Sequence, residues 1–228
     1  MGMPFCFKMD FEYISRPSIF STRDSALFLM EVVNRIQNCL SVETDGNVLI
    51  RIEEKVSRIF FFEEKRFFSV YFPFSIQKLS CFDETQKSFQ CNYAFFFKSN
   101  LVSSLVISDV ISLLVDEKLR NLSENAIDDL VYKIDDFFLD EDGLHVDTDR
   151  EQIAWNIYSH LMTCEPGYLR YDYDEENKDK PDHPINHLDV NFSKTCTYKI
   201  GLPDKPRPSK EWFVEMCLSN PVKRINIL

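Results

Sequence analysis

Apolar positions in the first hundred residues recur mostly at every second residue, with one helical exception. The exception is segment 24–40, which follows Asp24, a residue we expect to cap the helix. Its apolar residues at helical spacing are Leu29, Val33, Ile36 and Leu40. Residues 1–23 alternate and predict an edge strand or a packed arm. Short segments rich in Phe, Val and Ile predict strands at 47–53, 56–62, 67–74 and 92–98. Charged turns join the first three, which is typical of an antiparallel meander.

The pattern becomes helical in the middle of the chain and returns to strands near its end. Helical spacing predicts helices at 108–119, from Ser123 to Phe138, and from Thr148, where Thr148 and Glu151 form a capping box. Strands are predicted at 168–174, 186–192 and 197–202, and a short helix follows Pro208. The sequence therefore predicts an α+β fold, an antiparallel sheet covered by helices. We expect one domain over 1–228, or two intimate lobes, 1–100 and 101–228. The pattern leaves open whether the strands form one sheet or two.

The last three predicted strands carry one polar face. Because strand side chains alternate, consecutive hairpins would bury Leu169, Tyr171, Leu188 and Val190 on one face. The residues expected on the other face are Arg170, Asp172, Asp174, His187, Asp189, Asn191 and Lys199. The stretch HPINHLDVNFS, residues 183–193, lies at the centre of this face.

Two interpretations of this polar face compete. It is either a solvated sheet surface, on which opposite charges pair across strands, or a site. In a site, Asp172, Asp189 and His187 would hold Mg²⁺ or Mn²⁺, since carboxylate oxygens and imidazole suit such ions. His187, Asp189 and Lys199 would be the catalytic residues, with Lys199 stabilising developing negative charge. Arg170 and Asn191 would be binding residues. The cofactor, if any, is left open.

Composition and charge narrow the classes of protein. The 228 residues are 44% hydrophobic and 28% charged, as in an ordinary globular chain. The seven cysteines include no close pair, which argues against a structural zinc site. With no signal peptide and no long apolar run, the expectation is a cytoplasmic protein without membrane contact. The formal net charge of −11 opposes wholesale phosphate-backbone binding, although the basic segment 192–228 could contact nucleic acid and the acidic segment 135–189 a protein partner.

Common catalytic signatures are missing, and one resemblance suggests a biological setting. There is no GxGxxG, GxxxxGK[ST], HExxH or GxSxG. HPINHLDVNFSKTCTYKIGL followed by RPSKEWFVEMCL resembles the C-terminal part of an uncharacterised bacterial family, a domain of unknown function met beside restriction and other anti-phage genes. The resemblance implies a prokaryotic, cytoplasmic setting and a role in defence. It assigns no catalytic residue.

Three functions remain open on these grounds. The first is a non-catalytic accessory or interaction component of an anti-phage defence locus, with a protein partner. The second is a metal-dependent nuclease or phosphoesterase that uses Asp172, His187, Asp189 and Lys199. The third is a DNA mimic, whose acidic region 135–189 would occupy a DNA-binding protein. Whether the chain is an enzyme is not decided by its sequence.

Overall fold

The computed structural model describes residues 4–9, 19, 21–39, 46–53, 56–83, 88–116, 148–175, 184–190, 198–202 and 207–218. The helices within these ranges are α1 (Thr22–Cys39), α2 (Ser104–Val115), α5 (Thr148–Thr163) and α6 (Lys210–Leu218). The strands are β1 (Phe5–Phe7), β2 (Val48–Ile52), β3 (Ser57–Phe62), β4 (Arg66–Tyr71), β5 (Ser75–Asp83), β6 (Ser88–Phe97), β7 (Asn100–Leu101), β8 (Leu169–Tyr173), β9 (Asn186–Val190) and β10 (Tyr198–Gly201). No helix in these ranges has the length and apolar character needed to cross a bilayer.

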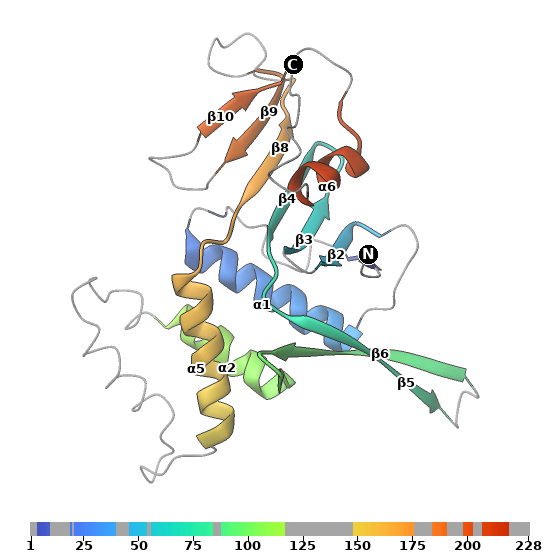
Figure 1. The fold of residues 1–228 in the computed structure, drawn as a ribbon, viewed down its shortest axis with the longest axis vertical. Helices are drawn as coiled ribbons and strands as arrows, with labels where there is room; N and C mark the ends of the chain where they lie inside the picture. Colours follow the sequence, from blue (N-terminus) through green and yellow to red (C-terminus); the bar gives the residue numbers. More distant parts are fainter. Residues whose placement is uncertain are drawn as a thin grey trace, which may run out of the picture.

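The strands form two antiparallel sheets, so the predicted α+β class is confirmed. The larger sheet has seven strands in the order β1-β2-β3-β4-β8-β9-β10, and the smaller one has the order β5-β6-β7. Both predicted meanders belong to the larger sheet, because β4 pairs with β8 across a long gap in sequence. Figure 1 shows β8, β9 and β10 extending away from the end of the molecule that holds α1, α2 and α5.

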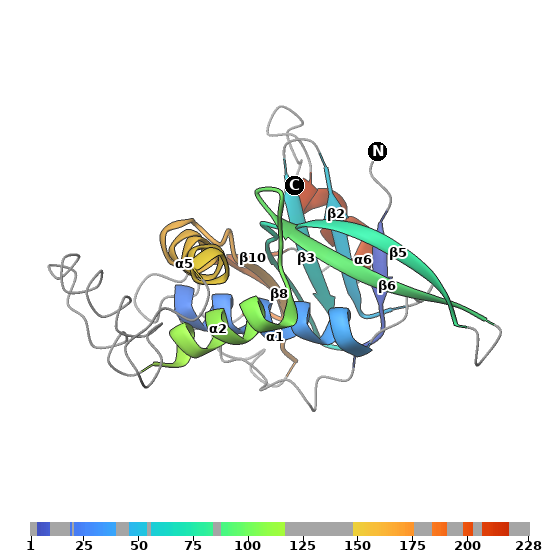
Figure 2. The same cartoon turned by 90° about the horizontal axis from the view of Figure 1, so that it is seen from below.

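Helices pack against both faces of the seven-stranded sheet. Alternation along β3 directs Phe61 toward one core, which contains α1, α2 and α5, and Phe60 toward a second core, which contains α6. On the α1 face, the Phe28 ring lies 4.8 Å from that of Phe61. On the α6 face, the Phe213 ring lies 6.3 Å from that of Phe60. The turned view in Figure 2 shows α2 lying beside α1.

Two helix starts differ from the prediction. Asp24 is not the cap of α1: its backbone N–H donates to the Ser21 hydroxyl at 3.1 Å, so Ser21 takes that role. Likewise, α2 begins at Ser104, and its N-cap is Ser103, whose side chain accepts from the Val106 N–H. In both cases a serine just before the apolar run offers an oxygen to an otherwise unpaired N–H of the first turn. The apolar spacing located the helices, and these hydroxyls determine where they begin.

The strand prediction missed one long element. β5 (Ser75–Asp83) pairs with β6 over its whole length, although its sequence lacks regular alternation. The two strands form the ribbon that projects beyond α1 in Figure 1. The helix predicted from Ser123 to Phe138 falls outside the described residues, as does most of the loop 174–184.

The pH dependence of stability should contain a contribution from His160 on α5. Its ring packs 5.3 Å from the Phe97 ring, and its Nε2 atom is buried without a hydrogen-bond partner in the described part of the chain. Burial, followed by the charge of Lys98, lowers the pKa of His160 below its ordinary value. The unfolded chain therefore binds the proton more readily, and stability falls as the pH drops through about 6.5.

The variant His160→Phe tests this contribution, because it keeps an aromatic ring and removes the titrating group. We expect its free energy of unfolding to change less than that of the wild type between pH 7.5 and about 5.5, by urea denaturation at each pH. Parallel pH profiles for the two proteins would contradict the assignment.

Candidate functional site

Strand register brings the predicted polar residues together in two rows across the sheet. Antiparallel pairing places Asp172 of β8 opposite His187 of β9, and Arg170 opposite Asp189. On the next strand, β10, Lys199 lies opposite Asp189. Directly opposed residues point to the same face of a sheet, so all five share one face. The predicted meander of consecutive hairpins, and the alternation of its polar and apolar faces, are thus confirmed.

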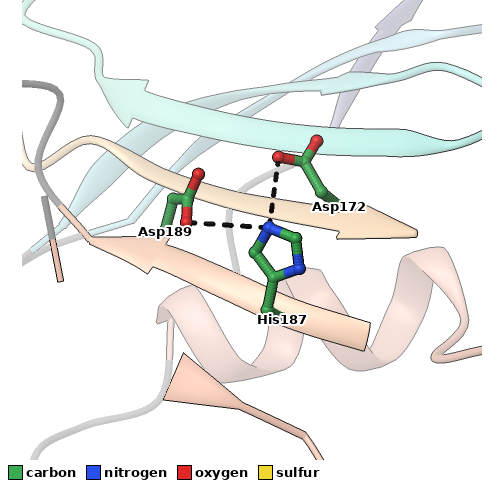
Figure 3. Close-up of side chains that lie close together, drawn as sticks. All are labelled: Asp172, His187 and Asp189. Carbon is green, nitrogen blue, oxygen red and sulfur yellow. Dashed lines mark ion pairs between the residues drawn. The ribbon is translucent and has the colours of Figure 1, made fainter. Parts of the chain in front are cut away.

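The centre of this polar face is buried and its rim is exposed. The exposed fractions of Asp172, His187 and Asp189 are 9%, 1% and 2%. Figure 3 shows both carboxylates turned toward the same edge of the imidazole ring. His187 Nε2 lies 3.8 Å from Asp172 Oδ2 and 3.8 Å from Asp189 Oδ1. One ligand atom from each of the three residues lies within 4.8 Å of the others.

The orientation of His187 is set by Pro184. His187 Nδ1 lies 2.9 Å from the Pro184 carbonyl oxygen, which can only accept a hydrogen bond, so Nδ1 carries a proton. In the neutral ring the lone pair is then on Nε2, the nitrogen that faces the two carboxylates. Gly201 on β10 leaves room for this arrangement, because a Cβ there would lie 2.9 Å from the Pro184 Cγ atom. A backbone carbonyl thus gives the histidine the tautomer that a metal ligand needs.

Two arginines hold the carboxylates in place. The Arg170 guanidinium bridges them, with Nε 2.7 Å from Asp172 Oδ2 and Nη2 bonded to Asp189 Oδ2. Arg66 on β4 donates from Nε to Asp172 Oδ1 at 2.7 Å. Burial alone would lower the pKa of Arg170, but Tyr168 and the two carboxylates outweigh it and raise that pKa above its ordinary value. Arg170 is therefore a permanent cation that sets the spacing of the two acids.

One carboxylate oxygen is left without a hydrogen bond. Asp189 Oδ1 is buried and has no hydrogen-bond partner among the described residues. Two nitrogen atoms lie close to it, His187 Nε2 and Lys199 Nζ, each at 3.8 Å. An unsatisfied carboxylate oxygen in such a place costs free energy unless a cation balances it. This oxygen faces His187 Nε2, toward which an Asp172 oxygen also points (Figure 3).

A pocket opens onto Asp172 and His187 of this cluster, although Asp189 is not among its lining residues. Its volume is about 460 Å³, and its walls include Asp172, His187, Lys199, Arg66 and Arg170. The other lining residues are Glu63, Lys65, Tyr173, Asp174 and Glu175. Acids and the bases Lys and Arg are equal in number among the lining residues, so the pocket does not present a field of a single sign.

The predicted site residues are thus largely together. Asn191, predicted to bind a ligand, lies outside the described residues. Two basic residues of the C-terminal segment lie away from this site. Arg207 and Lys210 lie over the rings of Phe67 and Phe62, which belong to the α6 core on the opposite face of the sheet. They do not contact the Asp172–His187–Asp189 cluster.

Two contributors could not be found from the sequence. Arg66 lies in a charged segment of the sequence, and only the pairing of β4 with β8 places it opposite Asp172. Pro184 lies before β9, and its carbonyl oxygen orients His187. Every residue has a backbone carbonyl, so the sequence does not single out Pro184 as the hydrogen-bond partner of His187.

The donor set fits a divalent cation. A metal bonded at roughly 2.1 Å holds neighbouring ligands about 3 Å apart, so the two 3.8 Å gaps to His187 need to close by about an ångström. The two carboxylate oxygens, which lie within 4.8 Å of each other, need to approach by up to about 2 Å. Two carboxylate oxygens and one imidazole suit Mn²⁺ or Mg²⁺, and the pocket leaves positions for water or substrate. The cluster resembles an open, catalytic type of metal site more than a closed structural one.

Comparisons with known proteins do not add to this description: no family model, no curated protein and no solved structure matched the chain.

Proposed function

We propose that this chain is a phosphoesterase of the nuclease type that depends on a divalent metal. Asp172, His187 and Asp189 would hold one Mn²⁺ or Mg²⁺ on the face shared by β8 and β9. The observation that carries the proposal is Asp189 Oδ1, a buried carboxylate oxygen without a hydrogen bond, 3.8 Å from the lone-pair nitrogen of His187. A solvated sheet surface would not leave such an atom buried.

The pocket supports phosphate chemistry for a reason of charge. A metal held by Asp172, His187 and Asp189 would supply an activated water for the hydrolysis of a phosphate ester. Arg66, whose side chain is 45% exposed, and Lys199 line the same pocket and would stabilise charge on the phosphoryl oxygens. Arg170 would act by positioning the two carboxylates.

Calorimetric titration with Mn²⁺ tests the proposal. The wild type should bind the ion, and Asp189→Asn should lose at least about a hundredfold in affinity, since it removes a ligand charge and keeps the side-chain shape. Hydrolysis of bis(p-nitrophenyl) phosphate should require Mn²⁺ and should disappear in the same variant. Asp174→Asn is the matched control, because Asp174 lines the pocket but lies outside the cluster.

The titration is informative only if the variants are folded. Circular dichroism should show all three proteins folded, and His187→Gln replaces Asp189→Asn if the latter does not fold. Equal affinity in the wild type and the ligand variants would contradict the metal site. A protein that neither binds Mn²⁺ nor hydrolyses the ester would leave the accessory role in a defence locus and the DNA mimic as the remaining proposals.

A further inference from the structure

The side chain of Lys199 lies among the candidate metal ligands. Its Nζ atom is 3.4 Å from His187 Nε2 and 3.8 Å from Asp189 Oδ1. These two atoms belong to the set that would bind the cation. The lysine reaches them from β10, where it lies opposite Asp189, and its side chain is 34% exposed. It therefore extends from the edge of the pocket into the cluster.

The contact between Lys199 and His187 is that of a cation with a lone pair. Because His187 Nδ1 donates to Pro184, Nε2 of the neutral ring can only accept. The ammonium group has donors and no acceptor, so it must be the donor in this contact. Lys199 thus uses the same lone pair that a metal would use.

The Lys199 ammonium group and a divalent metal ion would repel each other at this cluster. Asp172 and Asp189 supply two negative charges, while Arg66, Arg170 and Lys199 supply three positive ones. Arg66 and Arg170 are paired with Asp172 Oδ1, Asp172 Oδ2 and Asp189 Oδ2. A divalent ion bound by His187 Nε2 and Asp189 Oδ1 would lie within a few ångströms of the Lys199 ammonium group, where like charges repel strongly.

We infer that the Lys199 ammonium occupies the cation site of the metal-free protein, and that a divalent metal binds only by displacing it. The inference rests on the proposed function and adds that Lys199 competes with the metal for its site. Lysine has a flexible four-carbon stem, so the displaced group can swing outward without moving β10. Its exit lies along the pocket, where a substrate phosphate would be bound. Metal binding and the delivery of Lys199 to the substrate are then one event.

Three proteins test the exchange in Mn²⁺ titrations: the wild type, Lys199→Met and Lys65→Met. Methionine keeps an unbranched side chain and removes the competing charge. We expect Lys199→Met to bind Mn²⁺ about tenfold more tightly than the wild type, or better, because no ammonium has to leave. Lys65→Met removes the same charge from the same pocket and leaves Lys199 in the cluster. Its affinity for Mn²⁺ should stay within about twofold of the wild type, because Lys65 is exposed and exposed charges are screened.

A second measurement separates occupancy from general electrostatics. Saturating Mn²⁺ should raise the melting temperature of Lys199→Met by more than that of the wild type, because ligand stabilisation follows affinity. In contrast, hydrolysis of bis(p-nitrophenyl) phosphate at saturating Mn²⁺ should be slower in Lys199→Met, since the displaced ammonium is missing from the substrate.

Each outcome decides a different statement. Wild-type binding with unchanged or weaker affinity in Lys199→Met would overturn the exchange and leave the metal site intact. Equal tightening in Lys199→Met and Lys65→Met would also overturn it, since net charge alone would then explain the result. If neither the wild type nor Lys199→Met binds Mn²⁺, the proposed function fails, and the exchange fails with it.

Discussion

Replacing Arg170 with methionine is expected to lower the free energy of unfolding by about 3–5 kcal/mol. The guanidinium bridges Asp172 and Asp189, whose side chains are only 12% and 3% exposed. Methionine would fill much of the space but leave two buried carboxylates close together, with Arg66 and Lys199 as their remaining cations. Removing one partner of a buried ion pair costs more than the pair contributes, because the other charge stays desolvated.

Denaturation in urea at neutral pH measures this effect, with the slope against urea expected to be unchanged. The control is Arg66→Met, since Arg66 also pairs with Asp172 but its side chain is 45% exposed. We expect about 1 kcal/mol or less for that change. Adding Asp189→Asn to Arg170→Met should recover part of the lost stability, because it removes one of the unpaired charges. Equal effects of the two arginine variants would show that Arg170 does not hold the cluster.

Truncating Phe61 to alanine should also cost about 3–5 kcal/mol. Phe61 is fully buried in β3 on the α1 face, and its ring is stacked 4.6 Å from that of Phe68 on the adjacent strand. It also contacts Phe28 of α1, with ring centroids 4.8 Å apart. The cavity would therefore open between the helix and the two central strands of the sheet, where neighbouring rings cannot collapse without losing other contacts.

Thermal or urea unfolding of Phe61→Ala measures this loss in the free energy of unfolding, and Leu105→Ala is the control. Leu105 is an apolar residue of α2 that is 61% exposed, so its truncation should change stability by less than about 0.5 kcal/mol. A Phe61→Ala protein as stable as the Leu105→Ala control would mean that α1 does not pack on the sheet as described.

The sequence by itself determined the class of the fold and the content of the polar face. Period-two and period-3.6 segments were distinct, and apolar spacing identified Leu29, Val33 and Ile36 as core residues of α1, which the structure confirms. Alternation along three short strands also predicted that Asp172, His187 and Asp189 share one face, as the register now shows. Such properties are local, because the direction of each side chain follows from its own strand or helix.

The limits of the sequence were also physical. The hydroxyl oxygens of Ser21 and Ser103 each accept a hydrogen bond from a first-turn N–H, and several polar residues near each helix start could have done the same. β5 was not predicted, because its sequence lacks regular alternation. It pairs with β6 along its full length, and its own composition does not reveal that partner.

Only the tertiary structure decided that the polar face is a candidate site. The pairing of β4 with β8 joins two distant parts of the chain and places Arg66 opposite Asp172. Burial leaves Asp189 Oδ1 without a hydrogen bond, and the Pro184 carbonyl turns the lone pair of His187 toward it. Alternation tells which way a side chain points but not what covers it or which strand lies beside it. Those two facts depend on long-range packing. Here they distinguish a solvent-exposed strand from a buried cluster in which Asp189 Oδ1 has no hydrogen bond among the described residues.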